Sequence, residues 1–288
     1  MNLRTALGLG RVSNLPTVWT DVLAALALAG APLAHASTMG LVVALSCFYL
    51  GGMYLNDAFD APRDARERPE RPIPSGRVRR GTVSAIGTGG LLLGTVLLAA
   101  VAGTAGHAPG RAALAGAALA LAILVYDAWH KTNPLSPVFM GLNRLLVYVA
   151  AAVAATGSAG WPVLAGGALL LCYVVGLTYA AKQEHLDRVG RLWPLAFLAV
   201  PFVAGLAAGT PSPAFYVLLA AFLAWVAHAV SLLLCPQPPV GRAVVSLIAG
   251  IALFDASVLT STGQFVWAAL ACLAFLLTLA LQRWVPGT

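Results

Sequence analysis

The chain has 288 residues, of which 60% are hydrophobic and only 9% are charged. Soluble globular domains carry about 25% charged residues, so this composition excludes an ordinary soluble domain. The net charge is +7, but the basic residues fall in short loops and form no long basic surface, which excludes nucleic acid as an expected partner. The four cysteines lie within apolar runs at no metal-like spacing, and we interpret them as small core residues.

Apolar runs that are long enough to cross a bilayer as helices recur along the whole chain. Backbone groups in lipid must be hydrogen-bonded within their own segment, so the sequence predicts an all-α, polytopic membrane helical bundle. Gly-, Pro- and Ser-rich segments separate the runs. The weakest predictions are the short seventh run and the last pair, so we expect nine or ten spans in a single domain, residues 1–288. The candidate spans are residues 15–34, 38–58, 81–103, 110–128, 136–156, 161–182, 192–208, 213–234, 241–260 and 264–284.

The loops on the two sides of the membrane differ greatly in their number of basic residues. If both termini lie on one side of the membrane, fifteen of the 17 basic residues fall on that side. Arg111 alone falls on the opposite side, and Arg144 lies within a span. Basic loops stay in the cytoplasm, so we expect an integral protein of a bacterial inner membrane with its charged loops cytoplasmic.

Most of the charge is concentrated in residues 54–80, where acidic side chains alternate with seven arginines. On a helix, Asn56, Asp57 and Asp60 would share about 100° of one face. Asp64 would continue this stripe, but Pro62 is expected to bend or end the helix first. Carboxylates beside arginines suit Mg²⁺ bound next to an anion such as a phosphate. The alternative is that the arginines act only as a cytoplasmic retention signal.

Two further cytoplasmic loops carry most of the remaining polar side chains. The loop after the fourth span contains Tyr126, Asp127, His130 and Lys131, and the loop after the sixth span contains Tyr179, Lys182, Gln183, Glu184 and Asp187. Glu184 and Asp187 are spaced i, i+3, so they form a second acidic pair at a helix end. Either that pair belongs to the functional site, or it only forms ion pairs with Lys182, Arg188 or Arg191 on a solvated surface.

Polar side chains also occur inside the spans, where exposure to lipid is unfavourable. We therefore expect Asn143 and Arg144 to face an internal cavity. Arg144 would either bind a diphosphate or pair with an acid such as Asp127. Asp21, near the cytoplasmic end of the first span, is a further candidate for lining an acceptor pocket.

The order of these motifs is similar to a known family. The sequence Asn56-Asp57-x-x-Asp60-x-x-x-Asp64, followed by Arg68-Pro69-x-Arg71-Pro72-Ile73-Pro74-Ser75-Gly76, resembles the first aspartate-rich motif of the UbiA superfamily of intramembrane prenyltransferases. The resemblance covers roughly residues 11–190. It departs from the family at the second motif, commonly DxxxD, where this chain has Gln183 and Asp187 with Glu184 beside them. One carboxylate is displaced or lost, which puts a second Mg²⁺ site in doubt.

The resemblance implies a helical bundle, usually of nine spans, whose central cavity opens sideways to lipid. It also implies a Mg²⁺-dependent enzyme that transfers a prenyl group from an isoprenyl diphosphate to an aromatic, polyol or lipid acceptor. By position, Asn56, Asp57, Asp60 and Asp64 would hold Mg²⁺ and the diphosphate, and Arg71 would contact phosphate oxygens. Tyr126 and Lys131 resemble a family tyrosine and basic residue, although their spacing is one residue longer than expected, so His130 is the alternative. Tyr179, Lys182, Asn143 and Arg144 are further candidates for substrate binding.

The chemistry is consistent with these residues. An allylic diphosphate ionises when Mg²⁺, Arg and Lys neutralise its leaving group, and an apolar bundle keeps water away from the allylic cation. Glu184 or Asp187 would then orient the acceptor or take its proton, and we count both as candidate metal ligands as well. Two alternatives are a membrane transporter, whose site would lie nearer the bilayer midplane, and a non-catalytic protein that binds prenyl diphosphates.

Overall fold

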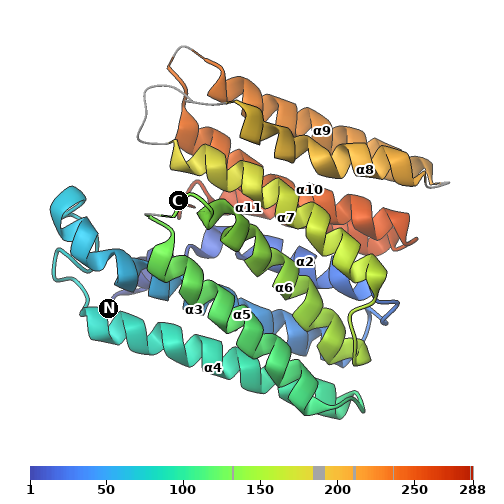
Figure 1. Cartoon of the computed structure of the whole chain (residues 1–288), viewed down its shortest axis with the longest axis horizontal. Coiled ribbons are helices and arrows are strands. Elements are labelled where there is room, and N and C mark those ends of the chain that lie inside the picture. Colours follow the sequence, from blue (N-terminus) through green and yellow to red (C-terminus); the bar gives the residue numbers. More distant parts are fainter. Residues whose placement is uncertain (132, 184–191, 210–211, 236, 286, 288) are drawn as a thin grey trace.

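The protein, described from a computed structural model, is a bundle of helices that run side by side (Figure 1). The structure describes residues 1–131, 133–183, 192–209, 212–235, 237–285 and 287, and these residues contain no strand. The helices are α1 (Leu3–Leu9), η1 (Val12–Asn14), α2 (Leu15–Leu28), α3 (Ala36–Glu67), α4 (Arg80–Thr104), α5 (Pro109–Trp129), α6 (Ser136–Thr156), α7 (Trp161–Lys182), η2 (Trp193–Ala199), α8 (Val200–Ala208), α9 (Pro213–Leu233), α10 (Val240–Ser261) and α11 (Phe265–Leu281). The prediction of an all-α membrane bundle is therefore confirmed.

Seven helices are long and apolar enough to cross a membrane, namely α3, α4, α5, α6, α7, α9 and α10. Three shorter apolar segments, Val12–Leu28, Trp193–Ala208 and Phe265–Leu281, correspond to the first, seventh and tenth predicted spans. At about 1.5 Å per residue, the 14 residues of α2 reach only about 21 Å, which is less than the roughly 30 Å hydrocarbon core of a bilayer. Of the spans that the sequence marked as weakest, the seventh and tenth correspond to short apolar segments, whereas the ninth is the 22-residue helix α10.

Local sequence explains where these helices begin and end. Proline occupies the first turn of α2, α5, α6, α7 and α9, a position where its missing N–H is not needed. The end of α6 is Gly157, whose φ of 82° is in the left-handed region that favours glycine. This turn separates α6 from α7, which pack against each other.

The centre of the bundle is α10, which packs against α2, α7, α9 and α11. A second group is formed by α3, α4 and α5, and among the described residues α3 and α4 have the most extensive contact of all helix pairs. Between these groups lie α2 and α6. The ends of α3, α5 and α7 that carry the charged motifs point to the same end of the bundle, where both chain termini also lie (Figure 1).

One prediction about the helix that carries the acidic motif is wrong. The sequence led us to expect that Pro62 would end or bend this helix before Asp64, but α3 continues without interruption to Glu67. Proline cannot donate to the carbonyl of residue i−4, which is Ala58. That carbonyl instead accepts a hydrogen bond from Arg80 Nε at 2.8 Å. A side chain thus replaces the missing backbone bond, and Asp64 remains on the helical stripe.

Candidate active site

A cavity of about 420 Å³ lies between α2, α3, α5, α6, α7 and α10. Its mouth, at the charged end of the bundle, is lined by polar side chains that include Asn56, Asp60, Asp64, Asp127 and Lys131. Its interior is mainly apolar, with Leu45, Phe48, Leu119, Val147 and Val174 among the lining residues. The shape therefore suits an amphiphile with a charged head and an apolar chain.

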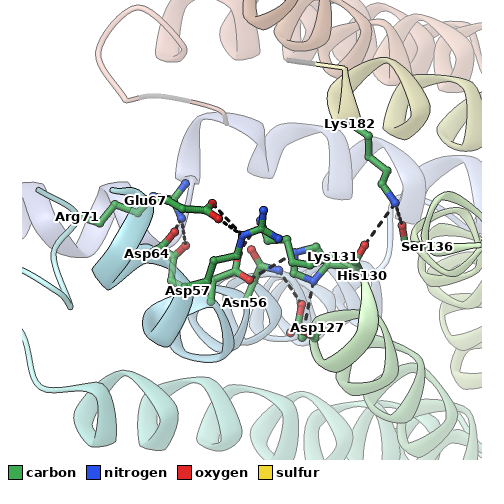
Figure 2. A network of polar contacts seen from close by, with 12 residues as sticks. Asn56, Asp57, Asp64, Glu67, Arg71, Asp127, His130, Lys131, Ser136 and Lys182 are labelled. Carbon is green, nitrogen blue, oxygen red and sulfur yellow. Dashed lines mark hydrogen bonds and ion pairs between the residues drawn. The ribbon is translucent and has the colours of Figure 1, made fainter. Parts of the chain in front are cut away.

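The acidic stripe of α3 forms one wall of the mouth, where each carboxylate contacts a cation from another segment. Asp64 Oδ2 contacts Arg71 at 2.9 Å, and Asp57 Oδ1 contacts Arg71 at 3.6 Å and Arg11 at 3.4 Å. Asn56, Asp60 and Asp64 are buried. Figure 2 shows the labelled side chains of α3 facing those at the end of α5. These contacts place alternating positive and negative charge along the mouth of the cavity.

Asp60 contacts both basic residues that follow α5. Lys131 Nζ lies 3.1 Å from one carboxylate oxygen and His130 Nε2 lies 3.5 Å from the other. The His130 ring also stacks on Tyr126, one helical turn earlier, with ring centroids 4.9 Å apart. The sequence left open whether His130 or Lys131 is the basic residue at this position, and the structure brings both to Asp60.

Asp127 and Lys182 complete the mouth. Asn56 Nδ2 donates to Asp127 Oδ1 at 3.0 Å, while Asp127 Oδ2 is buried without a hydrogen-bond partner among the described residues. Lys182 Nζ donates to Ser136 Oγ at 2.8 Å (Figure 2), and it also donates to Asn133 O at 3.0 Å. Lys182 therefore ties the end of α7 to the start of α6 while it lines the cavity.

The interior polar residues differ in part from the sequence interpretation. Arg144 does line the cavity, and it pairs with an acid as the sequence allowed, but its partner is Asp21 and not Asp127. Asp21 is fully buried behind it and is not among the lining residues. Asn143 lines the cavity, whereas Tyr179 packs against the hydrophobic core and is absent from the lining.

Glu184 and Asp187, the predicted second acidic pair, lie outside the described residues. Their predicted roles in catalysis and metal binding therefore stay predictions. Gln183, the last described residue before them, is the C-cap of α7. The second motif thus begins at the same end of the bundle as the first.

Arg11 is a residue of the mouth whose role the sequence did not indicate, since there it counted only as a topological charge. Its backbone is left-handed, with φ 41°, a conformation that is uncommon outside glycine and that often marks a functional position. Tyr49 donates its hydroxyl to Arg11 O at 3.0 Å. Burial lowers the pKa of the guanidinium, but Asp57 and neighbouring acidic groups outweigh this effect and hold that pKa above its ordinary value. Arg11 is therefore a fixed positive charge beside Asp57.

Mg²⁺ fits the donor chemistry of this mouth. The described residues contain no group of three or more His, Cys, Asp or Glu side chains that converge as a complete metal site. Mg²⁺ does not need such a group, because it binds through one or two carboxylates together with water and substrate phosphates. The α3 carboxylates and the unpaired Asp127 oxygen are hard oxygen donors of the kind that it prefers.

The fold and the cavity together define an integral membrane protein of the prenyltransferase type. The UbiA prenyltransferase family model matches residues 14–191, and the chain belongs to this family. The match ends just after the segment that carries the second motif, in agreement with the extent that the sequence predicted.

Individual relatives support the same placement. The chain is 34% identical over 134 residues to a digeranylgeranylglyceryl phosphate synthase of Methanopyrus kandleri (strain AV19), and this match spans 46% of each chain. A solved structure from work on a digeranylgeranylglyceryl phosphate synthase in membranes has a TM-score of 0.58 at 19% identity, covering 92% of this chain and 98% of the other. The apo structure of a UbiA homolog from Aeropyrum pernix K1 has a TM-score of 0.51 at 17% identity, with 94% and 95% coverage. These two structures share the fold.

Proposed function

We propose that this protein transfers a prenyl group from an isoprenyl diphosphate to an aromatic, polyol or other small lipophilic acceptor, with the help of Mg²⁺. The observation that carries the proposal is the cavity, in which carboxylates and cations surround the mouth and apolar side chains line the interior. Membership of the UbiA prenyltransferase family supports the same reaction type.

The diphosphate would bind at the mouth, between the α3 stripe and the cations opposite it. Arg71 and Lys131 would bind its oxygens, and both lie within ion-pair distance of α3 carboxylates. Asp57, Asp60 and Asp64 would hold Mg²⁺, which supplies positive charge that stabilises the leaving diphosphate. His130, stacked on Tyr126, keeps a hydrogen-bonding ring beside Asp60. Fixed charges of this kind stabilise a developing anion without first having to reorganise.

The prenyl chain would occupy the apolar interior. Leu45, Phe48 and Leu119 line the slot between α3 and α5. Such a wall excludes water from an allylic cation, which would otherwise be hydrolysed. Once the bond from carbon to the diphosphate oxygen has broken, the acceptor attacks the same carbon and loses a proton. Glu184 or Asp187 would take that proton or orient the acceptor.

The location of the reaction also belongs to the proposal. We place the charged end of the bundle in the cytoplasm of a bacterial cell, because basic residues concentrate in its loops. Donor and acceptor would then enter from the cytoplasm or from the membrane itself.

A transporter is the principal alternative, and a non-catalytic diphosphate-binding protein is another. Transport sites usually lie near the bilayer midplane on interrupted helices. Here the carboxylates gather at one end of the bundle, and α3 is continuous through them. This asymmetry favours a site for the head of an amphiphile.

The test is diphosphate release by the purified protein in nanodiscs. Geranyl, farnesyl and geranylgeranyl diphosphates would each be supplied with a panel of aromatic and polyol acceptors, with and without Mg²⁺. We expect Mg²⁺-dependent release that rises with one class of acceptor. Donor binding without release under any condition would favour the binding protein, and neither binding nor release would favour the transporter.

A further inference from the structure

Asn143 and Arg144 are neighbouring polar residues that line the largely apolar interior of the cavity, in which Tyr49 and Thr178 are further polar lining residues. Asn143 and Arg144 are both on α6, about 12 Å along the helix axis from Ser136 at the mouth. Their lining neighbours on the same helix, Met140 and Val147, are apolar. A prenyl chain gains nothing from polar groups at this depth, so the pair suits a second ligand.

Arg144 is held in a fixed position. Its NH1 donates to Asp21, and its NH2 donates to Thr17 Oγ1 at 3.1 Å. A guanidinium has further N–H donors in a rigid plane. Because the Arg144 side chain is 13% exposed and lines the cavity, the remaining donors are available to a ligand there.

Asn143 supplies the complementary acceptor. Its Oδ1 is buried and has no hydrogen-bond partner among the described residues. A buried polar atom without a partner is unfavourable by about 1–3 kcal/mol. Because Asn143 lines the cavity, a rotation of its side chain would turn this oxygen to a ligand hydroxyl there, and an adjacent carbonyl or hydroxyl oxygen of the ligand would accept from Arg144.

The charge around this pair selects among ligands. Asp21 already neutralises Arg144, and a second carboxyl, Asp255, lies in the same network. Asp255 accepts from Thr20 Oγ1 and from Tyr148 OH, both at 2.5 Å. Asp21, Tyr148 and Asp255 are fully buried. One cation and two carboxyl groups leave no positive charge for an anionic ligand, and burying an unpaired anion is strongly unfavourable.

We propose that Asn143 and Arg144 form the binding site for the acceptor, and that this site binds a neutral lipophile bearing hydroxyl or carbonyl groups. Asp21 is a positioning residue that fixes Arg144 and cancels its charge, so that acceptors carrying a carboxylate or phosphate are disfavoured. This inference rests on the proposed function, because it names the acceptor class of the same cavity.

The test compares pairs of related acceptors, of which one member is neutral and the other is anionic. The pairs are 4-hydroxybenzyl alcohol with 4-hydroxybenzoate, and a 1-O-alkylglycerol with its phosphate. We expect the wild-type protein to bind the neutral member of each pair more tightly, measured by calorimetry in nanodiscs without donor or Mg²⁺. Asp21→Asn leaves Arg144 uncompensated, and should shift the ratio of the two affinities at least about tenfold toward the anion, because hydrogen bonds to charged groups are stronger.

A second variant keeps all charges in place. Asn143→Leu should weaken neutral acceptors by about tenfold, raising the acceptor KM while leaving the donor KM unchanged. Thr95→Val, whose hydroxyl bonds only to Leu91 O of its own helix in the described structure, is the matched control and should change neither. The melting temperature of each variant verifies that it is folded.

Three results would overturn the inference. They are tighter binding of the anionic member by the wild type, an unchanged ratio in folded Asp21→Asn, and no effect of Asn143→Leu on acceptor binding. If Asp21→Asn does not fold, the inference is tested by the acceptor binding of Asn143→Leu and by the ratio of the wild-type affinities for neutral and anionic acceptors. If the wild-type protein does not bind any isoprenyl diphosphate, that result counts against the proposed function itself. The failure of the proposed function and the failure of this inference are therefore distinguishable.

Discussion

At the scale of single residues, the mouth of the cavity is a set of carboxylates held by cations from elsewhere in the chain. Asp60 has the most connections, since it meets both His130 and Lys131 at the end of α5. Before substrate binds, these contacts keep the side chain buried and in place. A diphosphate and Mg²⁺ would replace these contacts when they bind, so the side chains of the stripe are already in position before the substrate arrives.

Asp60→Asn tests this arrangement, because it removes a charge while keeping nearly the same shape. We expect prenyl transfer to fall by about 10²–10³-fold, the usual effect of removing one electrostatic contact to a developing charge. Initial rates of diphosphate release at saturating donor would measure it. Glu70→Gln, at an exposed position in the loop that follows α3, is the control and should retain full activity. Equal activity of both variants would contradict the assigned role of Asp60.

Some of these residues are predictable from the sequence and others are not. Asn56 and Asp60 follow from helical spacing, because an i, i+4 stripe on an apolar helix has to face something polar, whereas Asp64, beyond Pro62, was indicated only by the resemblance to the family motif. Arg11 and Asp21 do not, since their importance arises from contacts with Asp57 and Arg144, which are 46 and 123 residues away in the chain. No local pattern specifies such partners.

At the scale of elements, α3 depends on a side chain from α4. Arg80 donates to the Ala58 carbonyl that Pro62 leaves without a backbone partner. The sequence contains both residues, but only the antiparallel packing of α3 on α4 brings them together. This is why the helix boundary was mispredicted.

A double-mutant cycle tests this substitution of partners. Arg80→Leu should destabilise the protein by about 1–3 kcal/mol, because a buried carbonyl becomes unpaired. In a Pro62→Ala background the new N–H bonds to Ala58, so Arg80→Leu should then have much less effect. Thermal unfolding in detergent measures the stability lost on Arg80→Leu in each of the two backgrounds. Arg79→Leu, at the neighbouring exposed position, is the control. An equal loss of stability in the two backgrounds would show that the contact of Arg80 with the Ala58 carbonyl does not stabilise the protein.

The contact of α3 with α4 also relies on glycine. A Cβ on Gly87 would lie 2.6 Å from Leu55 Cγ and 2.9 Å from Gly51 O, whereas one on Gly89 would meet nothing within 4 Å. Small residues of this kind allow membrane helices to approach closely.

Paired alanine substitutions on α4 separate packing from helix propensity. Gly87→Ala should lower stability by about 1–3 kcal/mol through overpacking. Gly89→Ala should leave stability equal or slightly higher, because alanine favours helix. Unfolding midpoints in a single detergent provide the comparison, and a reversed order would mean that the two helices pack differently.

At the scale of the whole molecule, the bundle has two chemically different ends. The charged ends of α3 and α5 and the N-terminus lie at one end (Figure 1), while Arg111 is the one basic residue that the sequence places at the other. The sequence predicts this organisation well, because hydropathy and charge are properties of composition. It could not predict which helices enclose the cavity, since that depends on how α2, α6 and α10 pack.

Cysteine labelling tests the orientation of the two ends. In a variant without native cysteines, Ser75→Cys lies in the charged loop and Ser158→Cys lies between α6 and α7 at the opposite end. Both positions are exposed. A membrane-impermeant maleimide added to intact cells should label position 158 and spare position 75 until the cells are opened. The reverse pattern would place the charged motifs outside the cytoplasm.

The central claim is that this cavity holds a prenyl diphosphate with its head at α3 and its chain in the interior. The most direct measurement is photo-crosslinking with an isoprenyl diphosphate that carries a diazirine at the far end of its chain. We expect crosslinks at Leu45, Phe48 or Leu119, which line the cavity, and their loss when unlabelled donor competes. Crosslinks confined to lipid-facing positions such as Leu92 and Val96 of α4, unaffected by competitor, would contradict the claim.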